Sequence, residues 1–172
     1  MVVMVISVLF GILLSAIRTV ERHTLQTVTR AEIKNIENAW KQYFAHYQMW
    51  PTNPPDNCID ARYADALRGL DAADNDSFNK DGIIFMEFTR FDSENRPANA
   101  WGESRRYNED ECAYYVMFDD DGDNRIQVPI EVPSSGGSGV STNLARSVAV
   151  WSFNPTRRDA SDRPAVLGSW QQ

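Results

Sequence analysis

The feature that most constrains this chain is an apolar run at its beginning. Residues 2–17 read VVMVISVLFGILLSAI and contain no charge, and the first charged residue is Arg18. A helix needs about 20 apolar residues to cross a bilayer, and this run is shorter. A secretory signal peptide has an apolar region of this length, but a basic stretch must come before it, and only Met1 stands here. We interpret the run as part of a membrane helix, with a buried core helix as the alternative.

A helical pattern continues beyond the apolar run. Residues 18–47 contain neither Gly nor Pro, and Pro51 is the first residue that interrupts the pattern. Large apolar residues recur at three- and four-residue steps, which places them on one helix face. They are Ile33, Ile36, Trp40, Tyr43, Phe44 and Tyr47. The sequence therefore predicts one long helix ending near Trp50. Its first half needs lipid or other helices around it, and its second half is amphipathic and packs on a domain.

The remainder of the chain is polar and acidic. Asp and Glu number 24 against 17 Lys and Arg, for a net charge of −7, and the mean hydropathy is −0.45. This balance disfavours direct binding of nucleic acid through a general basic field. His23 and His46 both lie on the predicted helix, too far apart to chelate one metal ion, and no nucleophile has a recognisable His and Asp setting. We therefore predict that the protein is not an enzyme.

After Pro51 the pattern predicts a small mixed domain. We expect a short helix over residues 58–70, a flexible loop at the SSGGSGVS segment, and an irregular tail in which Trp170 is packed. Runs of β-forming residues predict strands over 83–89, 113–118, 125–130 and 146–153. Strands joined by short turns indicate an antiparallel sheet, which the long helix can cover on one face. The expected fold class is α+β.

The sharpest local signal is the acidic sequence FDDDGDNRI. Asp119, Asp121 and Asp123 have the spacing of the first ligands of a calcium loop, although the twelfth position is Ile130 where such loops carry a bidentate Glu. The alternative is a solvated hairpin turn between the strands on either side, because Asp-Gly is itself a strong turn signal. The sequence leaves both interpretations open.

The order of these elements resembles the type IV pilin superfamily, and most closely the major pseudopilin of type II secretion systems. The apolar run looks like the membrane half of the pilin helix, and AEIKNIENAWKQYFAHYQMWPT looks like the half that ends in an aromatic-Pro-Thr turn. Three shorter pieces resemble the family's Trp-containing turn, its last strand and its closing Trp. They are Ala100-Trp101-Gly102, Val150-Trp151-Ser152 and Gly168-Ser169-Trp170. The resemblance spans nearly the whole chain.

The resemblance implies a pilin-like fold and a structural role. Residues 1–17 would be the membrane and filament-core segment, and residues 18–172 a periplasmic domain made of helix 18–50 and sheet domain 51–172. Such a subunit, methylated at its N-terminus, passes from the lipid of the bacterial inner membrane into a pseudopilus. There it polymerises with itself and with minor pseudopilins, on an inner-membrane assembly platform, to drive protein export. The alternatives are a pilin of a type IV or DNA-uptake pilus and a membrane-anchored calcium-dependent binding module.

Two features depart from the family. Its prepilin peptidase site, a basic leader followed by Gly, Phe-Thr-Leu and a Glu, is absent, and we expect a trimmed chain or a start placed too late. The family also binds calcium in its C-terminal loop, which here reads SFNPTRRDASDRPAVLGSW. Asp159 and Asp162 would be the ligands, assisted by Asn154, but three arginines in the same loop weaken the expectation of calcium there.

Cys58 and Cys112 are the two cysteines of the chain. An exported domain folds in an oxidising compartment, where the two would form a disulfide. The alternative is a pair of buried thiols.

Overall fold

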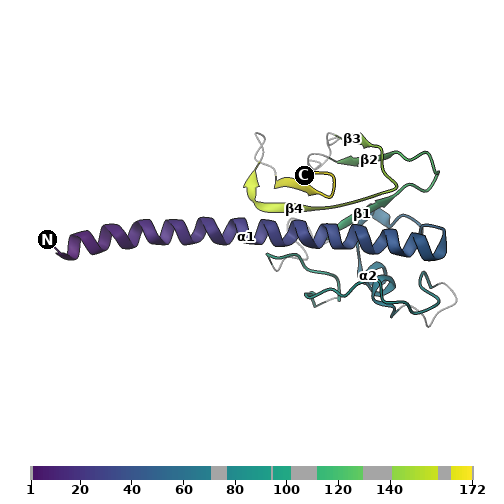
Figure 1. Ribbon diagram of the computed structural model, residues 1–172, viewed down its shortest axis with the longest axis horizontal. Coiled ribbons are helices and arrows are strands. Elements are labelled where there is room, and N and C mark those ends of the chain that lie inside the picture. The colour runs from purple at the N-terminus through teal and green to yellow at the C-terminus, as the bar shows by residue number, and fades with distance from the viewer. Residues whose placement is uncertain are drawn as a thin grey trace.

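The computed structural model describes residues 2–70, 77–93, 95–101, 112–129, 141–158 and 164–171. One helix, α1 (Val2–Tyr47), runs along the length of the molecule (Figure 1). Strands, short helices and loops surround its C-terminal part, and its N-terminal part projects from this body. The predicted α+β class is confirmed, with small antiparallel sheets beside a long helix.

Helix α1 is a single unbroken element. Its 46 residues contain no Pro, so nothing removes a backbone donor from its interior, and they extend about 69 Å at 1.5 Å per residue. It ends at Tyr47, slightly before the predicted end at Trp50, because Gln48 adopts a left-handed φ of 56°. Within the part of the chain that is described, no helix combines the length and apolar character of a membrane span.

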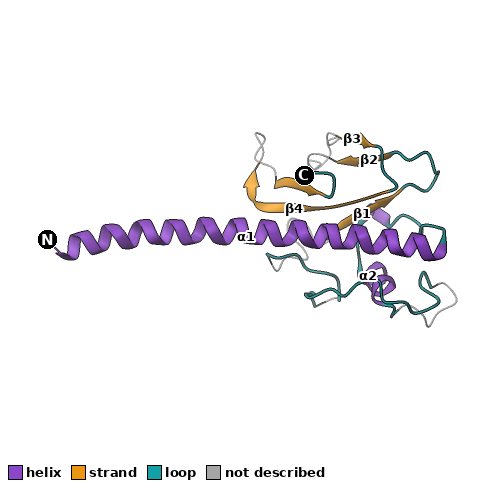
Figure 2. Cartoon of the chain, viewed as in Figure 1, coloured by secondary structure: helices purple, strands orange, loops and turns teal. Residues whose placement is uncertain are grey.

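The strands form two sheets on one side of α1 (Figure 2). The larger sheet is antiparallel in the order β1 (Tyr115–Phe118), β4 (Val148–Arg158) and β5 (Pro164–Gly168). The smaller sheet is the antiparallel pair β2 (Ile126–Pro129) and β3 (Ser141–Leu144). Strand β4 contacts α1 directly, and it is paired on both of its edges. Strands β1, β2 and β4 confirm three of the four predicted strands.

A short helix, α2 (Ala61–Arg68), lies on the other side of α1 (Figure 1). The side chain of Asp60 caps it by accepting a backbone N–H of its first turn. Gly69 ends it at a φ of 73°, and a Cβ at this position would lie 2.6 Å from the carbonyl oxygen of Gly82. These two boundaries make α2 shorter than the predicted helix over 58–70.

The core lies on both faces of the larger sheet. Successive residues of β4 point to opposite faces, so Val148 and Val150 pack toward α1, whereas Ala149 and Trp151 pack toward β2. The main cluster joins α1, α2, β1 and β4 through Ile33, Ile36, Trp40, Tyr43, Ile59, Tyr63, Leu67, Tyr114, Val116, Phe118, Val148 and Val150. The amphipathic half of α1 therefore packs against the body as predicted.

The predicted strand over 83–89 is wrong, because these residues form no ladder. The N–H groups of Phe85 and Met86 instead donate to the carbonyl oxygen of Leu67, at 2.8 and 3.2 Å. Both side chains pack against the main core cluster. The segment has the composition of a strand because it is half-buried. Its backbone hydrogen bonds go to the end of α2 instead of to another strand.

Two short strands lie where the sequence predicts none. Ser141, the last residue of the predicted flexible loop, begins β3, and the other residues of that loop lie outside the described ranges. Strand β5 occupies the tail that we expected to be irregular, and it pairs with β4 from Gly168 opposite Trp151. Trp170 packs as predicted, with its ring centroid 6.3 Å from that of Trp151.

Candidate functional site

The described side chains in the N-terminal part of α1 are exposed, except for Leu25 and Gln26, which are half-buried. The first buried residue of α1 among those described is Thr29, and the helix is embedded in the body from there to its end. We call residues 2–28 the stem. Figure 1 shows the N-terminal part of the stem projecting beyond the other described segments. A helix with apolar side chains in this position exposes surface that soluble monomers normally bury.

The exposed apolar side chains of the stem follow a regular spacing. Those described as exposed and large are Ile6, Phe10, Leu13, Leu14, Ile17, Val20 and Val28. From Ile6 to Val20 the steps are four, three, four and three residues, with Leu14 beside the line. An average step of about 3.5 residues is the spacing of a helix–helix seam. We call Ile6, Phe10, Leu13, Ile17 and Val20 the apolar stripe.

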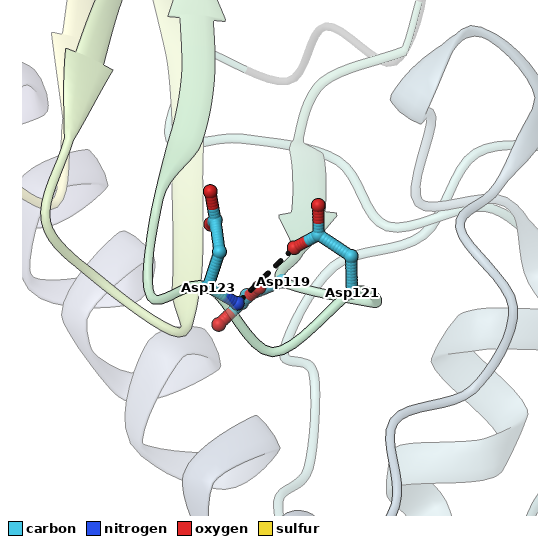
Figure 3. A group of neighbouring side chains, drawn as sticks. All are labelled: Asp119, Asp121 and Asp123. Carbon is cyan, nitrogen blue, oxygen red and sulfur yellow. Dashed lines mark hydrogen bonds between the residues drawn. The ribbon is translucent and has the colours of Figure 1, made fainter.

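The acidic loop between β1 and β2 brings the three predicted metal-ligating aspartates together (Figure 3). One carboxylate oxygen from each of Asp119, Asp121 and Asp123 lies within 4.8 Å of the others. Asp119 is buried, and its two oxygens accept the N–H groups of Gly122 and Asn124 at 2.9 and 2.8 Å. The loop thus closes on its own carboxylates.

Both interpretations of this loop fit its geometry. The hydrogen bonds hold a tight turn, and left-handed φ values at Gly122 and Asn124 suit those residue types. Three convergent carboxylates also provide the oxygen donors that a hard divalent cation prefers, and exposed Asp121 and Asp123 leave room for water ligands. The chemistry available here is cation binding.

The second predicted ligand group falls largely outside the described residues. Asp159 and Asp162 both lie there. Asn154 is buried in β4, in register with Ala165 of β5. The described residues therefore place only one member of that group.

Cys58 and Cys112 are joined in a disulfide, with their Cα atoms 5.6 Å apart. Cys58 follows a 3₁₀ turn, η1 (Pro55–Asn57), and forms an isolated bridge with Tyr115 at the start of β1. The sequence left open whether the two cysteines form a disulfide or remain buried thiols, and the structure contains the disulfide. It fastens the segment before α2 to the edge of the larger sheet.

Glu37 is a buried charge that the sequence analysis did not single out. Its carboxylate accepts hydrogen bonds from Lys41 at 2.6 Å, Lys34 at 3.3 Å and Arg146 at 3.2 Å. Burial alone would raise the pKa of Glu37, but the hydrogen bond and charge of Lys41, with those of Lys34, outweigh it and lower the pKa below its ordinary value. The spacing in the sequence could have indicated this residue. Glu37 lies four residues after Ile33, about one helical turn further on, and is therefore next to the buried face of α1.

A second charged group ties α1 to the body. Glu32 accepts hydrogen bonds from the hydroxyl of Tyr114 and from Arg90. Burial, followed by the negative charge of Glu32, raises the pKa of Tyr114, so its hydroxyl stays protonated and acts as a donor. This contact and the Glu37 group fix the rotation of α1 relative to the sheet.

No protein-family model, curated protein or solved structure matches this chain. The features of this chain that bear on its function are therefore its α+β fold, its largely exposed stem and its acidic loop.

Proposed function

We propose that this chain is a structural subunit of a pilin-like filament, nearest in kind to the major pseudopilin of a type II secretion system. Before assembly the stem lies in the lipid of the bacterial inner membrane and the body lies in the periplasm. On assembly, at an inner-membrane platform, stems pack against one another and against minor subunits, and the growing filament drives protein export. The observation that carries this proposal is the exposed apolar stripe on an unbroken helix.

The continuity of α1 supports the proposal. Ile36 and Trp40 bury one part of the helix in the body, while the apolar stripe lies on the same rigid element. Packing of stems would therefore fix the position of each body, which is what a regular filament requires. The disulfide suits an exported body, because oxidising compartments preserve such bridges.

Filament assembly by the purified full chain tests this proposal. We expect the chain to be dispersed in detergent and to form sedimenting filaments, visible by electron microscopy, once detergent is removed. Ile17→Asp places a charge on the apolar stripe and should abolish filaments. Thr19→Asp is the matched control, because it adds the same charge two residues away, about 200° around the helix, and should assemble.

The outcomes separate the proposal from its main alternative. Equal assembly of both variants, or no filaments from the native chain with minor subunits present, would reject the filament role. A chain that stays monomeric in vesicles and binds ligands only with calcium would instead be a membrane-anchored binding module. The acidic loop is the observation that favours this second candidate.

A further inference from the structure

A groove of about 810 Å³ lies where α1 ends, between the helix terminus and the acidic loop. One wall is apolar and is made by Phe44, Met49 and Trp50. Met49 is 65% exposed, and the rings of Phe44 and Trp50 stack at 4.5 Å between centroids. Asp119, Asp120 and Asp121 also line the cavity, and we call this part of it the acidic wall. We call this cavity the end groove.

The acidic wall of the end groove lacks cationic partners among the described residues. Asp120 and Asp121 are exposed, and no ion pair of the described part of the chain includes them. The pair of walls therefore suits an occupant that presents aliphatic and cationic groups together. Arginine fits this description well, because its guanidinium pairs with carboxylates and stacks on aromatic rings.

The stem presents a face of this kind. Leu14, Arg18 and Arg22 follow one another at four-residue steps, so they lie on one side of the helix, and all three are exposed. Neither arginine forms an ion pair within the described residues. Arg18 and Arg22 stand 18 residues, or five turns, before Ile36 and Trp40. They therefore continue the side of α1 that faces the body.

The stem and the end groove of one molecule cannot meet. Arg22 and Phe44 are 22 residues apart on one unbroken helix, which corresponds to about 33 Å. A second copy can make the contact if it is displaced along the helix axis by about this distance. The charge distribution favours such a partner, since residues 1–30 carry three arginines and one glutamate, whereas the rest carries 14 basic and 23 acidic residues.

We propose that the Leu14, Arg18 and Arg22 face of one copy docks in the end groove of a second copy. The inference rests on the proposed filament function and names a contact within it. The two surfaces differ, so the contact is head-to-tail and leaves a free stem and a free groove at the two ends, which propagates an open filament. In this contact, Arg18 and Arg22 of one copy pair with Asp120 and Asp121 of the second copy. Leu14 of the first copy packs toward the apolar wall of the groove.

Charge reversal tests the contact in the purified full chain, in low salt with a chelator present. Arg18→Glu with Arg22→Glu, and separately Asp120→Arg with Asp121→Arg, should each raise the critical concentration for filaments about tenfold. The chain with all four changes should assemble close to the native concentration. Arg30→Glu and Glu87→Arg are controls at exposed sites away from both surfaces and should have little effect.

Cysteine cross-linking gives the register. A chain with both Arg22→Cys and Asp121→Cys should form a ladder of disulfide-linked multimers, whereas a mixture of the two single variants should stop at dimers. Arg30→Cys with Asp121→Cys should give no ladder. Filaments that form without a ladder and ignore the charge reversals would overturn this contact but leave the filament function standing. Failure of the native chain to assemble at all would overturn both.

Discussion

At the scale of single residues, Glu37 is the buried carboxylate on which three cationic side chains converge. Three cations reach one buried carboxylate, so Glu37→Gln should lower the free energy of unfolding by about 2 kcal/mol at pH 7. The folded-state pKa of Glu37 lies below its ordinary value of 4.5, so its contribution is present above pH 4.5 and is lost as the pH falls through the lowered pKa. Urea unfolding at pH 7 and pH 3, followed by Trp fluorescence, measures the free energy of unfolding of the native chain and of the variant at each pH.

The pH dependence separates charge from packing at this position. The difference between the native chain and Glu37→Gln should shrink as the pH falls below 4.5, because the unfolded chain then takes up the proton in preference to the folded chain. Exposed Glu87→Gln serves as the control and should change little at either pH. An equal loss at both pH values would contradict the electrostatic explanation and assign the effect to the shape of the side chain.

The acidic loop yields a second prediction at this scale. Asn keeps the side-chain oxygen that closes the turn, so Asp121→Asn with Asp123→Asn should fold while losing two ligand charges. A site of three carboxylates binds calcium in the millimolar range, and a tenfold excess over Kd stabilises by about 1.4 kcal/mol. Calcium should therefore raise the Tm of the native chain by about 4 °C and leave that of the variant unchanged.

Thermal unfolding of the full chain in detergent, with calcium, magnesium or chelator, checks this. Magnesium should stabilise less, because it demands a stricter octahedral geometry. A Tm that calcium leaves unchanged in the native chain would identify the loop as a plain turn. The same rise in both chains would place the bound cation elsewhere.

At the scale of elements, the disulfide fastens parts of the chain that are distant in sequence. Cys58 and Cys112 are separated by 54 residues, and closing a loop of that length stabilises a fold by about 4 kcal/mol on the chain-entropy model. Cys58→Ser with Cys112→Ser should lower the unfolding free energy by about that amount in urea titrations. Reduction of the native chain should match the variant. A loss under about 1 kcal/mol would mean that the bridge hardly restricts the unfolded chain.

The elements that the sequence predicts well are those with a strong local period. Helix α1 is visible because its pattern persists over many turns, and β1, β2 and β4 carry dense β-forming residues. Strand β5 is defined by pairing with β4, which no local pattern encodes. Residues 83–89 were wrongly predicted as a strand. They have the β-forming composition of a strand because they are partly buried next to α2, but they form no ladder with another strand.

The same distinction holds for the candidate sites. The acidic loop is contiguous, so its three aspartates can be found by spacing alone. The end groove joins Trp50 to Asp120 and the Glu37 group joins α1 to Arg146, and both depend on contacts between distant segments. Only the fold brings such residues together, which is why sequence reasoning placed Phe44 on the apolar face of the helix and Trp50 at its end, and missed the groove.

At the scale of the whole molecule, helix α1 has two parts with different surroundings: the stem, and the C-terminal part that is embedded in the body. The body begins to cover α1 at Leu25 and Gln26, which are half-buried, whereas the described side chains before them are exposed. A helix without packing partners opens locally more often than one in a core. Residues 18–28 should therefore be the least protected part of α1 in a dispersed monomer and should become protected when stems pack together.

Limited trypsin digestion measures this difference. Arg18 and Arg22 should be cleaved quickly in the detergent-dispersed monomer and slowly in filaments, because packed helices cannot open into the protease. Arg68 is the internal control, since its pairing with Asp65 inside the body should protect it in both states. Equal cleavage of the stem before and after assembly would mean that the filament contacts leave it free. That result would contradict stem packing even if filaments form.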